Sequence, residues 1–517
     1  MTRFDPIVSR RIFLAGSLAL GATGLWSCGG SARVPVLPGD PFALGVASGD
    51  PLADGVVLWT RLAPLPLAPA GGMPAESVPV RWELAADEGF RTILQQGEII
   101  ARPQLAHSVH VEVSGLQPAR WYWYRFHCGK DVSAVGRTRT MPAADVVPER
   151  FRFAFVSCQN FEQGLFTAYE HLAKEELELV VHLGDYIYEY AGKDKQVRKH
   201  LGPECTTLDG YRTRYAQYKS DPALKAMHAA VPWLVTPDDH EFDNNCANDI
   251  SEEKGVERAA FLQRRAAAYQ AYYEHMPLRR SSLPTGPDML LFRRIQVGRL
   301  ADFHVLDTRQ YRSDQPCGDN NKPQCPEALL PSQTLLGAAQ RDWLFDGLGR
   351  SQATWNVLAQ QVMMARIDRK PGAEVAYSMD QWPGYEAERR QVLKYVHERK
   401  VRNPVVLTGD IHSNWANELI ADFDDLGGKV VATEFVGTSL SSGGNGATAP
   451  KDLDRILAEN PFLKFHNSER GYVCCELTSK KWRSDYRTVP FVDQPGAPIT
   501  TRASFVIEAG DPRLKPA

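Results

Sequence analysis

Short runs of alternating apolar and polar residues, separated by turn residues, fill the first part of the chain. Such alternation places Tyr122, Tyr124 and Phe126 on one face of a strand. Period-two patterning is typical of a sheet that buries one face. It predicts a β-sandwich of the immunoglobulin type over residues 41–143, in which no catalytic residue is apparent. The expected strands are Gly55–Thr60, Val78–Leu84, Ser108–Val113 and Trp121–Phe126.

The pattern changes after a linker at Pro142–Glu149. Continuous apolar runs such as Phe153–Val156 and Leu179–Leu183 now alternate with helix-like stretches, among them Tyr169–Glu178 and the amphipathic Glu257–His275. This alternation is typical of α/β proteins. We predict a domain over residues 150–510 with four layers, in which two facing mixed β-sheets are flanked by helices.

Four polar clusters carry the side chains of chemical interest. Three directly follow apolar runs, and the fourth follows Trp233-Leu234-Val235 and a Thr-Pro pair. Residues just past the carboxyl ends of buried strands are where α/β sheets place their chemistry. The clusters supply a thiol, carboxylates, phenols and two imidazoles, which suits metal ions and an oxyanion substrate. They are Ser157-Cys158-Gln159, Gly184–Glu189, Asp238–Glu241 and Gly409–His412.

The first two clusters indicate a metal with anionic ligands. Gly184 permits a tight turn, so Asp185 can approach an ion closely and bridge two cations. Tyr188 lies three residues further on, and a tyrosinate favours ferric iron over zinc. Cys158 stands where a ligand from the first strand belongs, as a metal-bound thiolate. The alternatives are a core aromatic for Tyr188 and a buried, inert thiol for Cys158.

The segment Asp238–Asn245 is dense in carboxylates, which repel one another unless a cation or protons compensate them. A solvated loop and a Ca²⁺ site both account for it, because Ca²⁺ takes carboxylate and amide oxygens. His240 beside these acids is a candidate proton donor or substrate-positioning group. Asp410 and His412 are two residues apart on an extended segment, so both can face one site.

Composition narrows the range of partners. Apolar residues make up 43% and charged residues 23% of the 517 residues, as in ordinary soluble enzymes. The net charge of −3 gives no basic field, so we expect no nucleic-acid-binding surface. Beyond the N-terminus, no apolar stretch reaches the roughly 18 residues of a membrane-spanning helix.

The N-terminus is typical of an export signal. Ser9-Arg10-Arg11-Ile12-Phe13-Leu14 precedes a mildly apolar run, which predicts a twin-arginine signal peptide over residues 1–28 and a linker over 29–40. An amphipathic helix is the alternative. Cys28 lies in a segment that resembles a lipoprotein cleavage box, so a lipid on Cys28 is one possible membrane anchor. We expect handling by the twin-arginine export machinery and a periplasmic, secreted or lipid-anchored protein.

The chain has nine cysteines, an odd number. Cys317 and Cys325 flank a polar loop and can pair in an oxidising compartment. Cys205 with Cys246 is a weaker candidate pair, and Cys128 has no obvious partner. Cys474 and Cys475 lie on an apolar strand, where burial as small hydrophobic residues is expected. These last two therefore indicate packing rather than chemistry.

In their order along the chain, the four clusters resemble the metallophosphoesterase arrangement, which implies that residues 150–510 form a catalytic, metallophosphoesterase-like sandwich. More specifically, they resemble the signature segments of the PhoD-type alkaline phosphatase family. Phe42–Pro51 and Val57–Arg61 resemble its N-terminal pattern, so the resemblance covers nearly the whole chain. Gly184–Tyr188 is also similar to the Gly-Asp-x-x-Tyr iron motif of purple acid phosphatases. The resemblance implies an exported alkaline phosphatase that releases phosphate from phosphomonoesters, also accepts diesters, and uses Fe³⁺ and Ca²⁺.

The resemblance also implies a ligand set. Asp185 would bridge the two metals, and oxygen ligands at the second position favour a hard ion over zinc. How the ligands divide between the metals is open to permutation. The Fe³⁺ ligands would be Cys158, Asp185, Tyr188 and His412, and the Ca²⁺ ligands Asp185, Asp239 and Asp410.

The implied mechanism is attack on phosphorus by a metal-bound hydroxide or oxide, with Asp185 and His240 as catalytic residues. His240 would protonate or position the leaving oxygen. Phosphate-binding residues remain unknown. Arg258, Arg264 and Arg265 are candidates for a bidentate contact, and the sequence does not choose among them.

Two rival functions remain open. A phosphodiesterase of phospholipase D type would use the same scaffold, with a pocket whose width is set by the loops Asp194–Cys205 and Asp314–Cys325. A cell-surface binding protein would use the β domain, with the α/β region as a degenerate support. That second rival predicts a lost ligand set, whereas every expected ligand position is filled.

Overall fold

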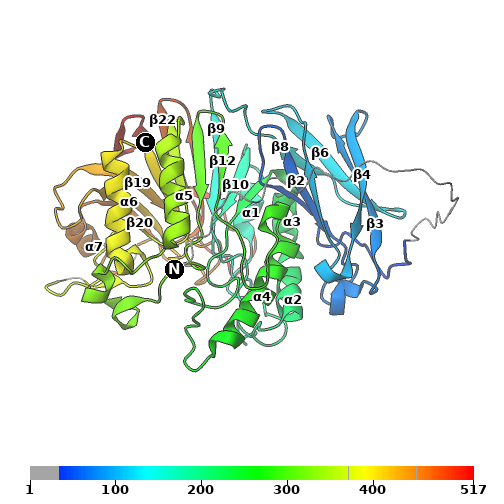
Figure 1. Ribbon diagram of the computed structural model, residues 1–517, viewed down its shortest axis with the longest axis horizontal. Coiled ribbons are helices and arrows are strands. Elements are labelled where there is room, and N and C mark those ends of the chain that lie inside the picture. The colour runs from blue at the N-terminus through cyan, green and yellow to red at the C-terminus, as the bar shows by residue number, and fades with distance from the viewer. Residues whose placement is uncertain (1–33, 371, 450) are drawn as a thin grey trace, which may run out of the picture. The chain divides into compact units, whose positions relative to one another are not determined.

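The computed structural model (Figure 1) describes residues 34–370, 372–449 and 451–517. Its larger β-sheet has ten strands. Four neighbouring strands, β9, β10, β11 and β1, run parallel, and antiparallel strands extend the sheet on both sides. In spatial order the strands are β24 (Asp511–Pro516), β23 (Thr500–Glu508), β22 (Lys481–Val489), β21 (Arg470–Leu477), β9 (Phe151–Val156), β10 (Leu179–His182), β11 (Trp233–Val235), β1 (Val46–Gly49), β2 (Val56–Arg61) and β5 (Ser108–Val113).

A second, seven-stranded sheet is also mixed, with β13, β15, β17 and β19 parallel. Its spatial order is β12 (Arg293–Val297), β13 (Ala301–Val305), β15 (Trp355–Ala359), β17 (Pro404–Thr408), β19 (Val430–Val436), β18 (Asn414–Ile420) and β20 (Leu463–Asn467). A two-stranded ribbon joins β14 (Asn321–Lys322) to β16 (Tyr377–Ser378).

The continuous apolar runs become central strands because both of their faces are buried. On β9, Phe153 and Phe155 pack in one core with Val357 of β15 and Val405 of β17, so this core joins the two large sheets. Ala154, the residue between the two phenylalanines, belongs to a different core. Alternate residues of one strand therefore pack in two cores, which explains why the run has no polar positions.

Helices complete those cores. The first four α-helices along the chain contribute to the core on the Ala154 face of the ten-stranded sheet, and the next two pack with β17 and β19 of the second sheet. α3 begins where Asp221 accepts hydrogen bonds from the amides of Ala223 and Leu224, with Pro222 in the first turn. The α-helices are α1 (Thr167–Leu172), α2 (Leu208–Lys219), α3 (Pro222–Ala230), α4 (Arg258–His275), α5 (Gly337–Arg350), α6 (Glu386–Glu398) and α7 (Leu453–Glu459). Across the described ranges, no helix is both long and apolar enough to cross a membrane.

The N-terminal region divides its strands between two sheets. β1, β2 and β5 belong to the ten-stranded sheet, and β1 pairs with β11 through Gly49 and Trp233. The other strands form a separate sheet, and Leu58 of β2 packs in one core with Val80 and Tyr124 from that sheet. This five-stranded sheet contains β4 (Ile93–Ala101), β3 (Val78–Ala85), β6 (Trp121–Cys128), β7 (Asp131–Val132) and β8 (Gly136–Arg139).

These observations test the predicted fold in part. The α/β class with several mixed and antiparallel sheets is confirmed, and the strand Ser108–Val113 has the predicted bounds. β4 was not predicted, and the helix expected over Tyr169–Glu178 ends at Leu172. The metallophosphoesterase-like layering, the immunoglobulin-like character of residues 41–143 and the domain boundaries stay predictions. The signal peptide and Cys28 lie outside the described residues.

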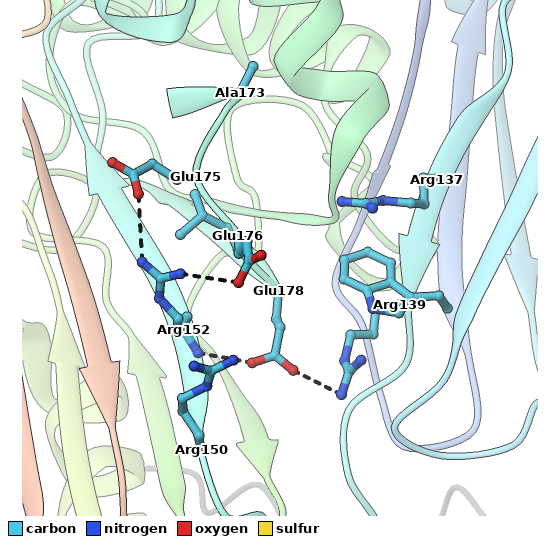
Figure 2. Close-up of a pocket in the computed structure, with 10 residues that line it drawn as sticks. Arg137, Arg139, Arg150, Arg152, Ala173, Glu175, Glu176 and Glu178 are labelled. Atoms are coloured by element: carbon cyan, nitrogen blue, oxygen red, sulfur yellow. Dashed lines mark hydrogen bonds and ion pairs between the residues drawn. The ribbon is translucent and has the colours of Figure 1, made fainter. Parts of the chain in front are cut away.

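An ion-paired seam connects β8 with the start of β9 and the segment after α1, around a cavity of about 590 Å³. Figure 2 shows Glu178 between Arg139 and the backbone of Arg152. Its carboxylate lies 2.8 Å from the Arg139 guanidinium and accepts a hydrogen bond of 2.9 Å from the Arg152 amide. Arg152 also pairs with Glu175 at 3.6 Å and with Glu176 at 3.8 Å. We call these five residues the seam.

The cysteines divide as the sequence suggests, with one exception. Cys317 and Cys325 form a disulfide, which confirms that prediction. The candidate pair Cys205 and Cys246 was wrong, because both thiols are free and buried. Cys474 and Cys475 are buried on β21, as expected of packing residues, and Cys128 is also free and buried.

Candidate metal centre

The four polar clusters lie at the carboxyl ends of strands from both sheets. Cys158 follows β9, and Asp185 follows β10, which pairs with β9 in parallel. Asp239 follows β11, the next parallel neighbour. Asp410 and His412 follow β17 of the seven-stranded sheet. Parallel pairing brings the carboxyl ends of β9, β10 and β11 to one edge, so their loops share a site.

A first group of donors joins all four side-chain types predicted for iron. Ligand atoms of Cys158, Asp185 and His412 lie within 4.8 Å of one another. The phenol of Tyr188 donates a hydrogen bond of 2.8 Å to Asp185 Oδ2, and its oxygen lies 3.0 Å from His412 Nε2. A thiol, a carboxylate, a phenol and an imidazole are thus held together, although they come from three distant segments.

Further donor groups adjoin the first. Asp185, Asp239 and His240 form one, and Asp238, Asp239 and Asp410 form an all-carboxylate one, each with ligand atoms within 4.8 Å of one another. Because Asp185 and Asp239 are shared, the groups are contiguous. We call the whole set the donor cluster. Asp238 was not among the predicted ligands, although it stands beside Asp239 in the acidic segment.

The acidic segment Asp238–Asn245 is packed into this site. Asp238, Asp239 and Glu241 are all buried, so the solvated-loop interpretation was wrong. The carboxylate of Glu241 accepts hydrogen bonds from the backbone amides of Asp238 at 2.7 Å and of Asp185 at 3.0 Å. Glu241 therefore fixes the two loops against each other rather than facing a ligand.

The backbone is strained at the donors themselves. Cys158, Asp185, Asp410 and His412 have φ values of 57°, 55°, 61° and 56°, in the left-handed region that non-glycine residues avoid. Such conformations cost on the order of 1–3 kcal/mol each and cluster at functional sites. At Gly184, an added Cβ would lie 2.4 Å from the Asp238 Cβ. The close approach of the β10 and β11 loops therefore requires glycine there.

The donor cluster has more buried negative charge than its neighbours neutralise. Asp185 Oδ1 and Asp238 Oδ2 are buried, and neither has a hydrogen-bond partner within the described part of the chain. Burial raises the pKa of Asp410 to about 7, even though Arg309 opposes that shift. Burial likewise raises the pKa of Asp238. Orphaned carboxylate oxygens beside a thiol and a phenol fit bound cations.

Arg309, which the sequence analysis missed, is the main cation on the protein side. It lies just beyond β13, fully buried, and its guanidinium donates to Asp238 at 2.5 Å, to Asp380 at 2.9 Å and to Asp410 at 3.0 Å. Unlike the strands before the donors, β13 carries the polar residues Asp302 and His304, so no continuous apolar run precedes Arg309. No local pattern in the sequence therefore marked Arg309 as part of the site.

The three arginines considered for phosphate binding have other partners. Arg264 pairs with Asp243 at 2.8 Å, and Arg265 pairs with Asp288 at 3.2 Å. Arg258 is largely exposed and pairs with Asp249. None of the three forms a hydrogen bond or ion pair with the donor cluster as far as the described residues show. Their expected contact with phosphate has no support from this geometry.

His240 belongs to the second donor group and lies where a proton donor was expected. Its Nδ1 is 2.8 Å from Glu189 Oε2, and its ring centroid is 4.1 Å from that of Tyr188. Burial opposes the charged imidazolium, but the carboxylates of Glu189 and Asp185 outweigh burial and raise the pKa of His240 well above its usual value. Glu189 therefore both orients the ring and holds its proton.

Comparisons with known proteins identify the family of this chain. The family model of the PhoD-like phosphatase matches residues 153–486, which is more than half of the chain, and that of the PhoD-like phosphatase N-terminal domain matches residues 31–142. The chain belongs to the PhoD-like phosphatase family. Family membership confirms the resemblance found in the sequence and the enzyme class, a phosphoric ester hydrolase.

One curated relative and one solved structure match nearly the whole chain. Alkaline phosphatase D of Bacillus subtilis (strain 168) is 54% identical over 518 residues, covering 98% of this chain and 88% of that protein. A solved structure of PhoD is 55% identical, with a TM-score of 0.91 and 93% of each chain covered. This PhoD-like phosphatase therefore shares its fold with that structure, including the N-terminal region.

Proposed function

We propose that this chain is an exported, metal-dependent alkaline phosphatase that hydrolyses phosphomonoesters and also accepts phosphodiesters. The observation that carries the proposal is the donor cluster, with its buried carboxylate oxygens that lack a partner in the described ranges. The family and the Bacillus subtilis relative support the reaction class. A degenerate support for a binding domain would not keep strained, uncompensated donors.

The donor chemistry supports two kinds of metal. The group with the thiol, phenol and imidazole suits Fe³⁺, and the group of carboxylates suits Ca²⁺. When bound, these cations would supply the Lewis acidity and the activated nucleophile that phosphoester hydrolysis needs. Fe³⁺ would be held by Cys158, Asp185, Tyr188 and His412, and Ca²⁺ by Asp185, Asp239 and Asp410, with Asp238 as an added candidate.

The residues around these donors have roles of their own. Arg309 holds Asp238 and Asp410 in place and offsets part of their charge. His240, oriented by Glu189, is suited to carry a proton at Nε2 for the leaving oxygen of the ester. Because Nδ1 is engaged by Glu189, the proton available for transfer is the one on Nε2.

We also propose export by the twin-arginine route. The paired Arg10 and Arg11 ahead of a mildly apolar run support this route. The Cys317–Cys325 disulfide supports an oxidising destination, because structural disulfides persist outside the cytosol. The mass of the N-terminal peptide after export shows whether Cys28 carries a lipid, and cell fractionation separates a periplasmic from a secreted protein.

Elemental analysis combined with chelation tests the proposal. Protein exported by its native host should contain iron and calcium, and prolonged chelation should remove both and abolish hydrolysis of a phosphomonoester. Hydrolysis that persists in metal-free protein would contradict the proposal. Comparing rates on a phosphomonoester and on phosphatidylcholine separates the phosphatase from a phospholipase D-type phosphodiesterase, which would prefer the second substrate.

A further inference from the structure

A loop from the seven-stranded sheet reaches the thiol and phenol donors. It follows β19 and contains Ser439, Ser441 and Ser442, all fully buried. Its backbone bonds to the loop after β9, because the Ser442 amide donates to the Cys158 carbonyl at 3.2 Å. The donors therefore have a neighbour that supplies no ligand of its own.

The Ser442 hydroxyl is placed between two parts of the donor cluster. Its Oγ lies 2.6 Å from the phenolic oxygen of Tyr188 and 2.8 Å from the Cys158 carbonyl oxygen. The amide of Asn160 donates to the same Oγ at 3.3 Å. The Ser442 hydroxyl therefore accepts from this amide and has one hydrogen to donate. Two acceptors lie within reach of that hydrogen, the Tyr188 oxygen and the Cys158 carbonyl oxygen.

Which acceptor receives that hydrogen depends on the state of Tyr188. As a phenol, Tyr188 gives its own hydrogen to Asp185. As a phenolate ligand it has no hydrogen left, and its oxygen becomes a strong acceptor. Its other contact, His412 Nε2, belongs to a proposed ligand. Among the described contacts of the Tyr188 oxygen, the Ser442 hydroxyl is then the one hydrogen-bond donor that is not itself a proposed metal ligand.

The loop is held firmly enough to make this contact specific. Arg470, which is buried, donates to the Gly444 carbonyl at 2.8 Å, to the His412 carbonyl at 2.7 Å and to the Ser439 hydroxyl at 2.5 Å. One guanidinium thus ties the serine loop to the segment that carries His412. Because Ser439 and Gly444 flank Ser442, these bonds hold the loop on both sides of Ser442.

We propose that Ser442 is a positioning residue that donates a hydrogen bond to the Tyr188 phenolate and tunes it as a ligand. The proposal rests on the proposed function, because it requires Tyr188 to bind Fe³⁺. A hydrogen bond to a ligand atom fixes its orientation and withdraws electron density from it. Ser442 therefore acts on the metal through Tyr188, without touching the metal itself.

The test compares variants that differ by one hydroxyl. Thr and Val have nearly the same shape, so S442T keeps the hydroxyl and S442V removes it, and S442A removes it with less bulk. S441A is the matched control, because Ser441 is also fully buried in this loop but donates to the Asn160 carbonyl instead. Iron content and thermal unfolding are measured for every variant.

The main readout is the visible absorption band from phenolate-to-iron charge transfer. Without the hydroxyl, the phenolate holds its electrons less tightly, so the band should move to longer wavelength in S442A and S442V. It should stay in place in S442T and S441A. Loss of such an outer contact typically lowers activity by about 10- to 100-fold, so kcat should fall by that factor in S442A and S442V.

Two results would overturn the proposal in distinguishable ways. An unchanged band in S442A and S442V, or an equal shift in S441A, would reduce Ser442 to a packing residue while leaving the iron site intact. A protein that contains iron but has no band sensitive to Y188F would refute Tyr188 as an iron ligand. The iron assignment of the proposed function would then fail together with this proposal.

Discussion

The seam and the donor cluster use the same kinds of charged side chain and arrange them in opposite ways. In the seam, Glu178 bridges Arg139 and the Arg152 backbone, and Glu175 and Glu176 both lie within 4.0 Å of Arg152. Every carboxylate there has an arginine partner, and the side chains of Arg139 and Glu178 remain 19% and 18% exposed. Nothing in that arrangement requires an ion.

The donor cluster lacks this balance. Arg309 is shared by Asp238, Asp380 and Asp410, while an oxygen of Asp185 has no partner in the described part of the molecule. Burial strengthens repulsion between carboxylates, so the imbalance is costly without added positive charge. The comparison teaches that the ratio of carboxylates to cations separates a ligand site from a structural ion-pair network.

The largest expected effect follows from Asp185→Asn. The amide keeps the shape but removes the charge that joins the donor groups, so metal content should fall and kcat with it, by at least about 10⁴-fold. In metal-free protein the same change should raise the free energy of unfolding, because one uncompensated charge is gone. Elemental analysis, phosphomonoester kinetics and urea unfolding of metal-free protein measure these effects.

The control for Asp185→Asn comes from the seam. Glu178→Gln makes the same chemical change at a paired carboxylate, so activity and metal content should stay at the wild-type level. If the two variants lost activity to the same extent, charge balance would not distinguish the regions. Lower stability of metal-free Asp185→Asn would also contradict the comparison.

A smaller effect is expected from Arg309→Met. Removing one partner from a buried ion pair typically costs about 3 kcal/mol or more, because the remaining carboxylates stay buried. The loss of unfolding free energy should therefore be greatest in metal-free protein and smaller when cations occupy the site. Denaturant unfolding with and without added metal measures the difference. An equal loss in both states would show that Arg309 acts through packing alone.

Most residues of the donor cluster could be predicted because each is marked by the pattern of its own short segment. Cys158, Asp185 and Asp410 each follow an apolar run that becomes a buried strand, so their positions could be read one segment at a time. The helix expected over Tyr169–Glu178 was too long, since Glu175 and Glu178 point to arginines of the seam instead of continuing the helix. Tertiary ion pairs overrode the local helical pattern.

Arg309 and Ser442 could not be found in this way. Arg309 is separated by 71 residues from Asp238 and by 101 residues from Asp410, and its role exists only once the two sheets are assembled. Ser442 is 254 residues from Tyr188, in a loop rich in serine and glycine that reads as an ordinary connection. The residues that support a site are recognised only from contacts between distant segments, whereas the donors here could be predicted from their positions at strand ends.

The smallest effect is expected from the seam itself. Glu178→Gln weakens a partly exposed ion pair, so unfolding free energy should fall by no more than about 1 kcal/mol and less at high salt. Denaturant unfolding at low and high ionic strength measures both values, and Glu398→Gln on α6, which loses only an exposed i,i+4 contact with Lys394, is the matched control. A salt-independent loss well above that of the control would mean that the seam is desolvated like the donor cluster. Its carboxylates would then be stabilising the junction of β8 and β9 through burial, and the contrast between the two regions would rest on cation number alone.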